Sequence, residues 1–236
     1  MMTELTLPII GYMHSSYKEK FGIPRQPNLV QVESYIEMSA PYNDVLAFEG
    51  IEAFSHLWLL WQFHDNKNPE KTQFRPQVRP PRLGGNKKIG VFATRSMYRP
   101  SPIGLSVVKL KCVKKEGKSV RVYVTGSDLL DGTPIVDIKP YIHYSDAVID
   151  AVSGYAQDEP NRKSVIWSDR AIKQKQQLLT SGKLSVQTAQ ELEAVLSLDP
   201  RPAYQDDEAR VYKMKFAAVD IAFTVGETTV NITAVE

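Results

Sequence analysis

The sequence contains very little cysteine and no long apolar run. Cys112 is the only cysteine among 236 residues, which excludes a disulfide framework, a four-cysteine zinc site and a three-cysteine iron–sulfur cluster within one chain. A single thiol fits a reducing compartment, so we expect a cytoplasmic protein. The N-terminus has no basic region followed by an apolar core, and the run HLWLLWQF is too short to span a bilayer. We therefore expect neither a secreted nor a membrane-embedded protein.

Several catalytic signatures are also missing. The sequence has no G-x-x-x-x-G-K-[ST] loop, no G-x-G-x-x-G after a strand and no G-x-S-x-G elbow. These absences argue against a P-loop nucleotide site, a Rossmann dinucleotide site and a serine hydrolase. The four histidines form no H-x-x-x-H pair and no acidic cluster flanks them, so no metal site is expected.

Acidic residues are absent between Lys71 and Lys115, where twelve basic residues lie. The net charge of the whole chain is only +2, so the remainder sums to −10. Such asymmetry is typical of a surface that binds a polyanion, because Lys and Arg release counterions from phosphates. The charge alone leaves a second interpretation open, in which a surface loop only keeps the protein in solution.

The first part of the chain has the pattern of strands. Alternating residues, with frequent Gly and Pro, predict a barrel or sandwich up to about residue 165. Within 107–113, Val108, Leu110 and Cys112 fall on one face, so we expect all three in the core. The segment 120–126 is predicted to form the next strand, joined by a tight turn at KKEGK.

The segment FSHLWLLWQFH predicts another buried strand. Its wholly apolar face holds Leu57, Leu59, Trp61 and Phe63. The opposite face includes His56 and further polar-tipped side chains, which favours the wall of a pocket. The alternative is that both histidines are hydrogen-bonded structural groups, and for His56 this is the preferred interpretation.

After residue 165 the periodicity becomes helical. Ser168 is expected to cap a helix that carries Ile172, Gln176 and Leu179 on its packed side. Ser185 is expected to begin a second helix, and the run VYKMKFAAVDIAFTVGETTVNITAVE predicts two or three strands. The second helix is expected to bury Ala189, Leu192, Val195 and Leu196.

These patterns predict a mainly β protein with two parts. Residues 1–160 are expected to form an N-terminal β domain, either a barrel or a sandwich. Residues 161–236 are expected to form a smaller C-terminal α+β module. The boundary is placed in AQDEPNRKS, where the strand pattern ends.

Three segments are too specific in composition to be simple connectors. They are residues 24–26, residues 79–106 and residues 128–141, which combine Pro and Gly with arginines and carboxylates. Rigid loops on a barrel are where binding functions are expected. The alternative, that Pro and Gly only build tight turns, applies best to Gly84-Gly85 and Asp131-Gly132.

Together these motifs resemble the TrmO (TsaA-like) family of S-adenosylmethionine-dependent tRNA methyltransferases. The matching strings, in the family's order, are Pro24-Arg25-Gln26, FEGIEAFSHLWLLWQFH, VRPPRLGGN, GVFATRS with YRPSPIGLS, DLLDGTPIVDIKPY and DPRPAY. The resemblance implies direct in-line N6-methylation of threonylcarbamoyladenosine beside the anticodon of threonine tRNA. It also implies that residues 1–160 form a β-barrel catalytic domain that binds S-adenosylmethionine. A homodimer with the cofactor near the subunit interface is implied as well. Ser101 stands where the family usually has Asn, and we expect this difference to modify the activity rather than abolish it.

The resemblance also implies a cofactor pocket. Asp128 or Asp131 suits the positive amino group or ribose hydroxyls of the cofactor, and Arg25 or Arg95 suits its carboxylate. No residue is assigned as the catalytic base, because the adenine nitrogen becomes acidic only as the bond forms. The full set of expected cofactor contacts is Pro24, Arg25, Gln26, His64, Asp65, Arg95, Leu105, Asp128, Leu129, Leu130, Asp131, Gly132, Thr133 and Pro134.

A tRNA surface is expected on the basic stretch. Tyr98 is predicted to stack on an extruded base. The DPRPAY string is predicted to present Arg201 and Tyr204 outward, although a helix stop and linker is the alternative. A non-catalytic tRNA- or RNA-binding module explains the basic stretch equally well, but not the carboxylates of DLLDGTPIVDIKPY. The expected phosphate contacts are Arg79, Arg82, Lys87, Lys88 and Arg99.

Overall fold

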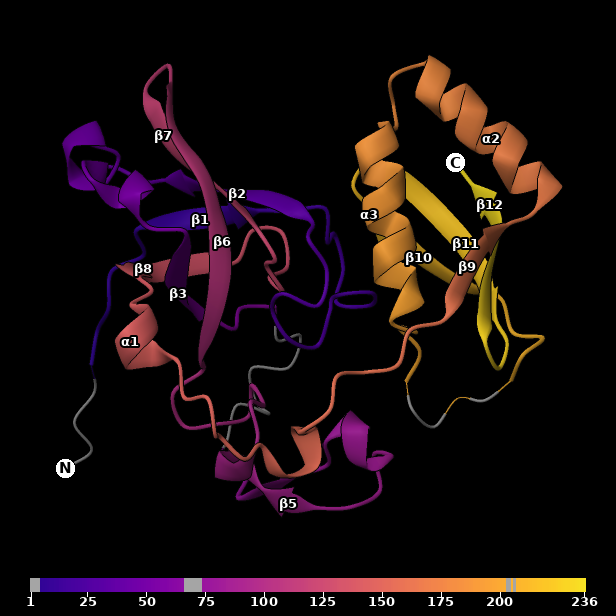
Figure 1. Cartoon of the computed structure of the whole chain (residues 1–236), viewed down its shortest axis with the longest axis horizontal. Helices are drawn as coiled ribbons and strands as arrows, with labels where there is room; N and C mark the ends of the chain where they lie inside the picture. The colour runs from indigo at the N-terminus through magenta and orange to yellow at the C-terminus, as the bar shows by residue number, and fades with distance from the viewer. Residues whose placement is uncertain (1–4, 66–73, 203–204, 206) are drawn as a thin grey trace.

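The computed structural model describes residues 5–65, 74–202, 205 and 207–236. A β-barrel and a second, smaller sheet with two helices lie side by side, and a small lobe extends below the barrel (Figure 1). The chain is therefore mainly β, as the sequence predicts. The barrel strands are β1 (Gly11–His14), β2 (Glu33–Met38), β3 (His56–Gln62), β6 (Ile103–Glu116), β7 (Ser119–Thr125) and β8 (Pro134–Pro140).

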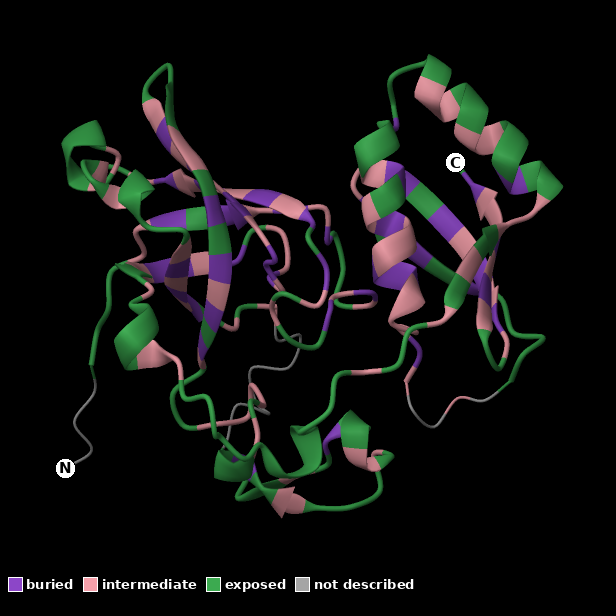
Figure 2. Cartoon of the chain, viewed as in Figure 1, coloured by how far each residue is buried: buried purple, intermediate pink, exposed green. Residues whose placement is uncertain are grey.

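The six barrel strands close in the order β1-β2-β7-β6-β3-β8, and every neighbouring pair is antiparallel. Alternate side chains point inward, so buried and partly exposed residues alternate along β2 and β7 (Figure 2). Leu57, Leu59 and Trp61 belong to the barrel core, which confirms the predicted apolar face of β3. Val108 and Val122 are fully buried in the same core.

The antiparallel order determines which loops meet. The β1–β2 loop (residues 15–32), the β3–β6 connection (63–102) and the β7–β8 loop (126–133) all join strands at the same end of the barrel. We call this end the loop rim. The β2–β3 connection (39–55) and the β6–β7 turn (117–118) lie at the opposite end. The three motif-rich segments of the sequence therefore converge on one rim.

Two strand predictions need correction. Cys112 is only half-buried, because a bulge between Leu110 and Cys112 shifts the β6–β7 register and turns Val113 toward the barrel core instead. Pro134–Pro140 is not loop but strand β8, so only the first half of DLLDGTPIVDIKPY is a connection. The hairpin turn at KKEGK is confirmed, with Gly117 at φ 63°.

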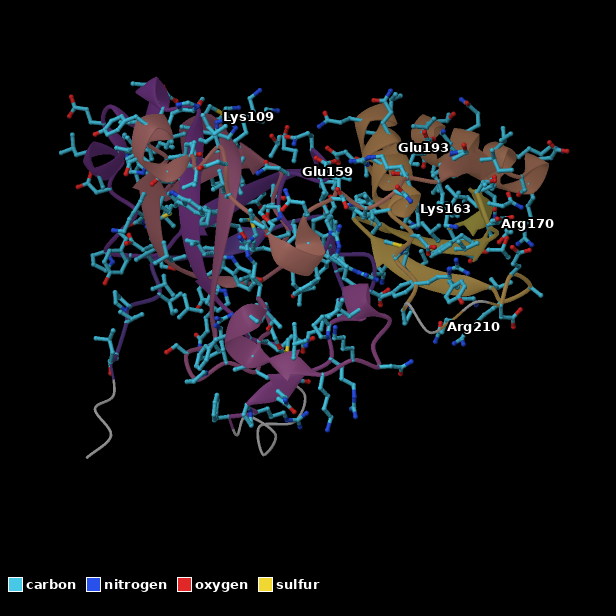
Figure 3. The ribbon with its side chains drawn as sticks, turned by 60° about the horizontal axis from the view of Figure 1, so that its bottom comes forward. Lys109, Glu159, Lys163, Arg170, Glu193 and Arg210 are labelled. Carbon is cyan, nitrogen blue, oxygen red and sulfur yellow. The ribbon has the colours of Figure 1, made fainter. Side chains whose placement is uncertain are left out.

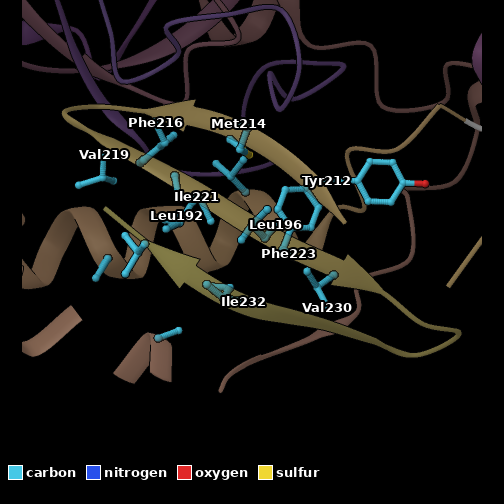
Figure 4. Close-up of a cluster of buried hydrophobic side chains, with 14 of the residues drawn as sticks. Leu192, Leu196, Tyr212, Met214, Phe216, Val219, Ile221, Phe223, Val230 and Ile232 are labelled. Carbon is cyan, nitrogen blue, oxygen red and sulfur yellow. The ribbon is translucent and has the colours of Figure 1, made fainter. Parts of the chain in front are cut away.

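The C-terminal part is a four-stranded sheet covered by two helices. Its strand order is β10-β11-β12-β9, with β9 parallel to β12 and the other pairs antiparallel. The buried side chains of the strands and of α3 form a dense apolar cluster (Figure 4). The elements are β9 (Ser164–Trp167), α2 (Asp169–Thr180), α3 (Val186–Ser197), β10 (Tyr212–Phe216), β11 (Val219–Val225) and β12 (Thr229–Val235).

Both helix starts are confirmed. The Ser168 hydroxyl accepts a hydrogen bond from the Ala171 N–H, and Ser185 caps α3 in the same way. The predicted packed side of α2 is wrong for Ile172, which is 51% exposed, and for Gln176, which is exposed. Leu179 packs against the core as predicted, and Ala171 is fully buried. Leu192 and the other three residues predicted for the α3 stripe are buried.

The core of the C-terminal sheet extends into the β1–β2 loop. Tyr17, Val30 and Val32 are buried in the same cluster as the C-terminal strands. Tyr17 forms an isolated bridge with Phe216, and their rings meet edge to face with centroids 5.9 Å apart. The C-terminal sheet is thus fixed beside the loop rim.

The remaining elements are short. One-turn helix α1 (His143–Asp146) is tied to the barrel by a 2.8 Å hydrogen bond from the Trp58 indole to Asp146. None of the helices within the described ranges is long and apolar enough to cross a membrane. The other elements are 3-10 helices η1 (Val45–Phe48) and η2 (Ile51–Ala53), and, in the small lobe, β4 (Gln77–Val78), η4 (Pro81–Leu83), β5 (Ile89–Gly90), η5 (Val91–Ala93) and η6 (Gly154–Ala156).

Candidate functional site

A partly buried carboxyl, that of Asp128, lies at the loop rim. Asp128 accepts a 2.6 Å hydrogen bond from the Ser106 hydroxyl, which in turn accepts one from the Trp61 indole at 3.0 Å. These residues come from the β7–β8 loop, β6 and β3, so the chain of hydrogen bonds depends on the closed barrel. Burial raises the pKa of the Asp128 carboxyl to about 6, although the hydrogen bond from Ser106 and the charge of Arg95 oppose the shift.

A guanidinium and an amide lie next to this carboxyl. Arg95 donates a 2.7 Å hydrogen bond to the Gln26 side chain, which joins the β3–β6 connection to the β1–β2 loop. The charge of Arg95 also acts on Asp128. The rim therefore places the positive group of Arg95 and the partly buried negative group of Asp128 close together, although their sequence positions are far apart.

The second predicted carboxylate is already engaged within the fold. One oxygen of Asp131 accepts the Ser15 N–H at 2.9 Å, and the other pairs with Lys18 at 2.9 Å. Asp131 therefore fixes the β1–β2 loop against the β7–β8 loop. Asp128 is the better candidate to interact with a ligand.

His64 and Asp65 follow β3 at the same rim. Asp65 pairs with Lys20 at 3.6 Å. Partial burial lowers the pKa of His64 below its ordinary value, with contributions from Lys20 and against the charge of Asp65. The His64 imidazole is therefore neutral at neutral pH, and it interacts with the backbone of Asp131.

The remaining residues of the predicted cofactor set differ in accessibility. Leu129 and Thr133 are each 1% exposed, so their side chains belong to the interior. Leu105 is half exposed, and Gly132 has open space where a Cβ would lie. A ligand at the rim can therefore approach Leu105 and Gly132, but not the side chains of Leu129 and Thr133.

A groove lies between the β1–β2 loop and the end of α3 with the segment that follows it. Its volume is about 600 Å³, and Pro24, Arg25 and Leu29 face Leu198 and Arg201 across it. Arg25 donates to the backbone carbonyl of Arg201 at 3.2 Å, so it bridges the two walls. The groove is within the size range of small-molecule sites.

The structure corrects the prediction that Arg201 points outward. Its side chain is only 9% exposed and binds both carboxylate oxygens of Asp199 at 2.9 Å. Asp199 has φ 49°, which turns the chain back on itself after α3. This pairing stabilises the groove wall, while Tyr204 lies outside the described residues.

The predicted tRNA contacts lie in the small lobe beside the rim. Arg79, Arg82, Lys87 and Lys88 are exposed on it. Arg99 is half-buried and donates to the Thr94 carbonyl at 3.0 Å. Within the described ranges, no three His, Cys, Asp or Glu side chains are arranged to hold a metal ion.

Sequence reasoning missed the residues that support the predicted ones. Ser106 and Trp61 position Asp128, while Lys18 and Lys20 pair with Asp131 and Asp65. Trp61 was recognised only as an apolar core residue, and the two lysines lie in a segment without a matching motif. Ser106 is the last residue of the motif YRPSPIGLS, and this position in the motif is the one signal for it in the sequence.

Comparison with known proteins gives consistent matches over the whole fold. A family model described as the tRNA-methyltransferase O N-terminal domain matches residues 12–147, and one described as the TrmO C-terminal domain matches residues 160–236. The chain is 45% identical over 208 residues to a protein of Escherichia coli K12 named tRNA (adenine(37)-N6)-methyltransferase, covering 88% of this chain and 86% of that protein.

Two matches from Pseudomonas aeruginosa agree with these. A protein named putative S-adenosylmethionine-dependent methyltransferase RcsF is 44% identical over 223 residues, covering 93% of this chain and 92% of that protein. The crystal structure of TrmO from the same organism superposes with a TM-score of 0.79 at 35% identity, covering 100% of this chain and 99% of that one.

Proposed function

Since the chain belongs to the TrmO family of S-adenosylmethionine-dependent methyltransferases, we propose that it methylates N6 of adenosine 37 in tRNA. This is the reaction in the name of the E. coli relative. The observation that carries the proposal is the convergence of the three motif-rich loops on one barrel rim, around Asp128 and Arg95.

The residues at the rim fit the methyl donor. S-adenosylmethionine carries an amino group, a carboxylate and a positively charged sulfonium, which activates its methyl group for transfer. Asp128 supplies a negative charge that Ser106 orients, and Arg95 supplies a positive one, held by Gln26. In this proposal Arg25, His64, Leu105 and Gly132 complete the pocket. Asp131 fixes the loops rather than the donor.

We propose that the transfer is direct and in line. The adenine nitrogen attacks the donor methyl carbon, the new N–C bond forms as the C–S bond breaks, and the nitrogen then loses its proton. Cys112 lies nine residues along β6 from the rim residue Ile103, or roughly 30 Å, so no thiol can carry the methyl group there. The rim residues act by aligning the reactants. Alignment can lower the activation free energy by on the order of 7–11 kcal/mol.

The acceptor is proposed to be threonylcarbamoyladenosine in threonine tRNA. Its threonine carboxylate requires cations close to the methyl-transfer site. Lys20 lines the groove next to the rim, and the groove volume of about 600 Å³ accommodates such a substituent.

This proposal assigns methyl transfer to residues 1–160, with residues 161–236 completing the groove. A homodimer remains part of it, supported by an exposed apolar segment after α1. Ile149 and Val152 in this segment, and Tyr144 within α1 itself, are each at least 90% exposed. The cytoplasmic location expected from the single cysteine stays a prediction.

A methyl-transfer assay tests the proposal. The purified chain is incubated with methyl-labelled S-adenosylmethionine and threonine tRNA that carries threonylcarbamoyladenosine 37, and the nucleosides are analysed by mass spectrometry. We expect one labelled methyl group on that nucleoside and none on tRNA with guanosine at position 37. Incorporation at another nucleotide contradicts the proposal, and tRNA binding without incorporation favours the non-catalytic RNA-binding alternative.

A further inference from the structure

The small lobe carries an exposed pair of phenylalanines. The β4–β5 ribbon, continued by a 3.0 Å hydrogen bond from the Val91 N–H to the Pro76 carbonyl, brings Phe74 and Phe92 together. Their ring centroids are 6.2 Å apart and their planes are inclined by 31°. Phe74 is 51% exposed and Phe92 is 70% exposed. Two adjacent aromatic rings are thus held in the solvent by a defined backbone.

The surroundings of this pair are strongly basic. Residues 74–99 contain seven Arg and Lys residues and no acidic residue. Long side chains extend outward from the lower lobe (Figure 3), and Arg79, Lys87 and Lys88 are exposed. A protein partner that binds through apolar contacts would gain little affinity from so many cations. Single-stranded nucleic acid uses both features, because bases stack on aromatic rings and phosphates pair with cations.

Tyr98, the residue predicted from the sequence to stack on a base, is less suitable. Its side chain is half-buried, and the Arg75 guanidinium already lies over its ring, 4.8 Å from the centroid. The ring is therefore part of the lobe's own packing. Phe92 offers a more exposed ring in the same basic lobe.

We propose that the Phe74–Phe92 pair is a stacking platform for unpaired bases of an RNA loop, with Arg79, Lys87 and Lys88 holding the adjacent phosphates. The inference rests on the proposed function in taking tRNA as the partner. It goes further in naming the residues that bind the loop and in requiring that the bound bases be unpaired.

Binding of an RNA hairpin by Phe92→Ala tests the proposal. The probe is an anticodon stem–loop RNA, and the same stem closed as a blunt duplex is the comparison. We expect Phe92→Ala to weaken hairpin binding by about 5- to 150-fold, the range for one lost stacked base, and to leave duplex binding unchanged. The slope of affinity against salt stays at the wild-type value because no charge is removed.

A second variant reports the contact itself. In Phe92→Trp, the fluorescence of the added tryptophan is expected to be quenched by the hairpin and not by the duplex. Leu46→Ala is the matched control, because Leu46 is 75% exposed but lies at the opposite end of the barrel. It is expected to bind the hairpin as the wild type does.

Three results would overturn the proposal. They are unchanged hairpin affinity in Phe92→Ala, equal losses for hairpin and duplex, or a weakened dimer in sedimentation with unchanged RNA affinity. The last result assigns the pair to a contact between two copies of the chain. These are binding measurements, so they remain informative if no methyl transfer is detected. Failure of the stacking platform is therefore distinguishable from failure of the proposed function.

Discussion

Replacing Asp128 with Asn is expected to weaken binding of S-adenosylmethionine by about 10- to 100-fold, which is the effect of losing one charge-assisted interaction. The asparagine keeps the size of the side chain and can still accept the hydrogen bond from Ser106, so only the negative charge is lost. Isothermal titration with S-adenosylmethionine measures the change. Asp44→Asn is the matched control, because Asp44 caps η1 at the opposite end of the barrel and asparagine caps equally well. Equal affinity of Asp128→Asn and the wild type would falsify the assignment.

Asp128→Asn is expected to weaken binding of S-adenosylmethionine but to raise the free energy of unfolding relative to the wild type. Burial raises the folded-state pKa of Asp128 from 3.8 to about 6. Between these values the folded protein retains a proton that the unfolded chain has lost, so stability falls as pH rises through this window. The wild type is expected to lose on the order of 3 kcal/mol relative to Asp128→Asn between about pH 4 and pH 6. Urea unfolding across that range therefore separates a lost ligand contact from a damaged fold.

Gly104→Ala is expected to destabilise the barrel by about 1–3 kcal/mol, which lowers the melting temperature by about 2–12 °C. Gly104 lies opposite Trp61 in the β3–β6 pair, and a Cβ there would meet the indole ring at 2.2 Å. The indole must then move, which breaks its 3.0 Å hydrogen bond to Ser106 and releases Asp128. Thermal unfolding and S-adenosylmethionine titration are expected to show both losses in the same variant.

Gly90→Ala is the control for this substitution. Gly90 has φ −59° and nothing within 4 Å of its Cβ position, so alanine fits without strain. Its melting temperature is expected to equal or slightly exceed that of the wild type. If Gly104→Ala behaves in the same way, then the close approach of Gly104 and Trp61 does not determine the geometry of the rim.

Side-chain periodicity was sufficient to predict much of the fold. Alternation predicts Leu57, Leu59 and Val108 in the barrel core, and the 3.6-residue repeat predicts Leu192 in the buried stripe of α3. The prediction for Cys112 failed because a bulge adds a residue to one strand, and nothing in an alternating pattern marks where that occurs.

The site was less predictable than the fold. Its motifs could be listed, but their convergence follows from closure of the barrel, which local patterns do not determine. The sequence predicts that Arg201 faces solvent, because a short turn fixed by prolines would present it outward. Its partner is Asp199, only two residues away, in a turn that depends on packing against the groove. Asp131 shows the same limit, because its carboxylate binds Ser15, more than a hundred residues earlier.

The most direct test of the account is a crystal structure of the chain with S-adenosylhomocysteine, the unreactive product of methyl transfer. The account predicts that its amino acid part lies at the loop rim, with the amino group at Asp128 and the carboxylate at Arg95. Binding at the opposite end of the barrel, or only in the groove between Leu29 and Leu198, would contradict it.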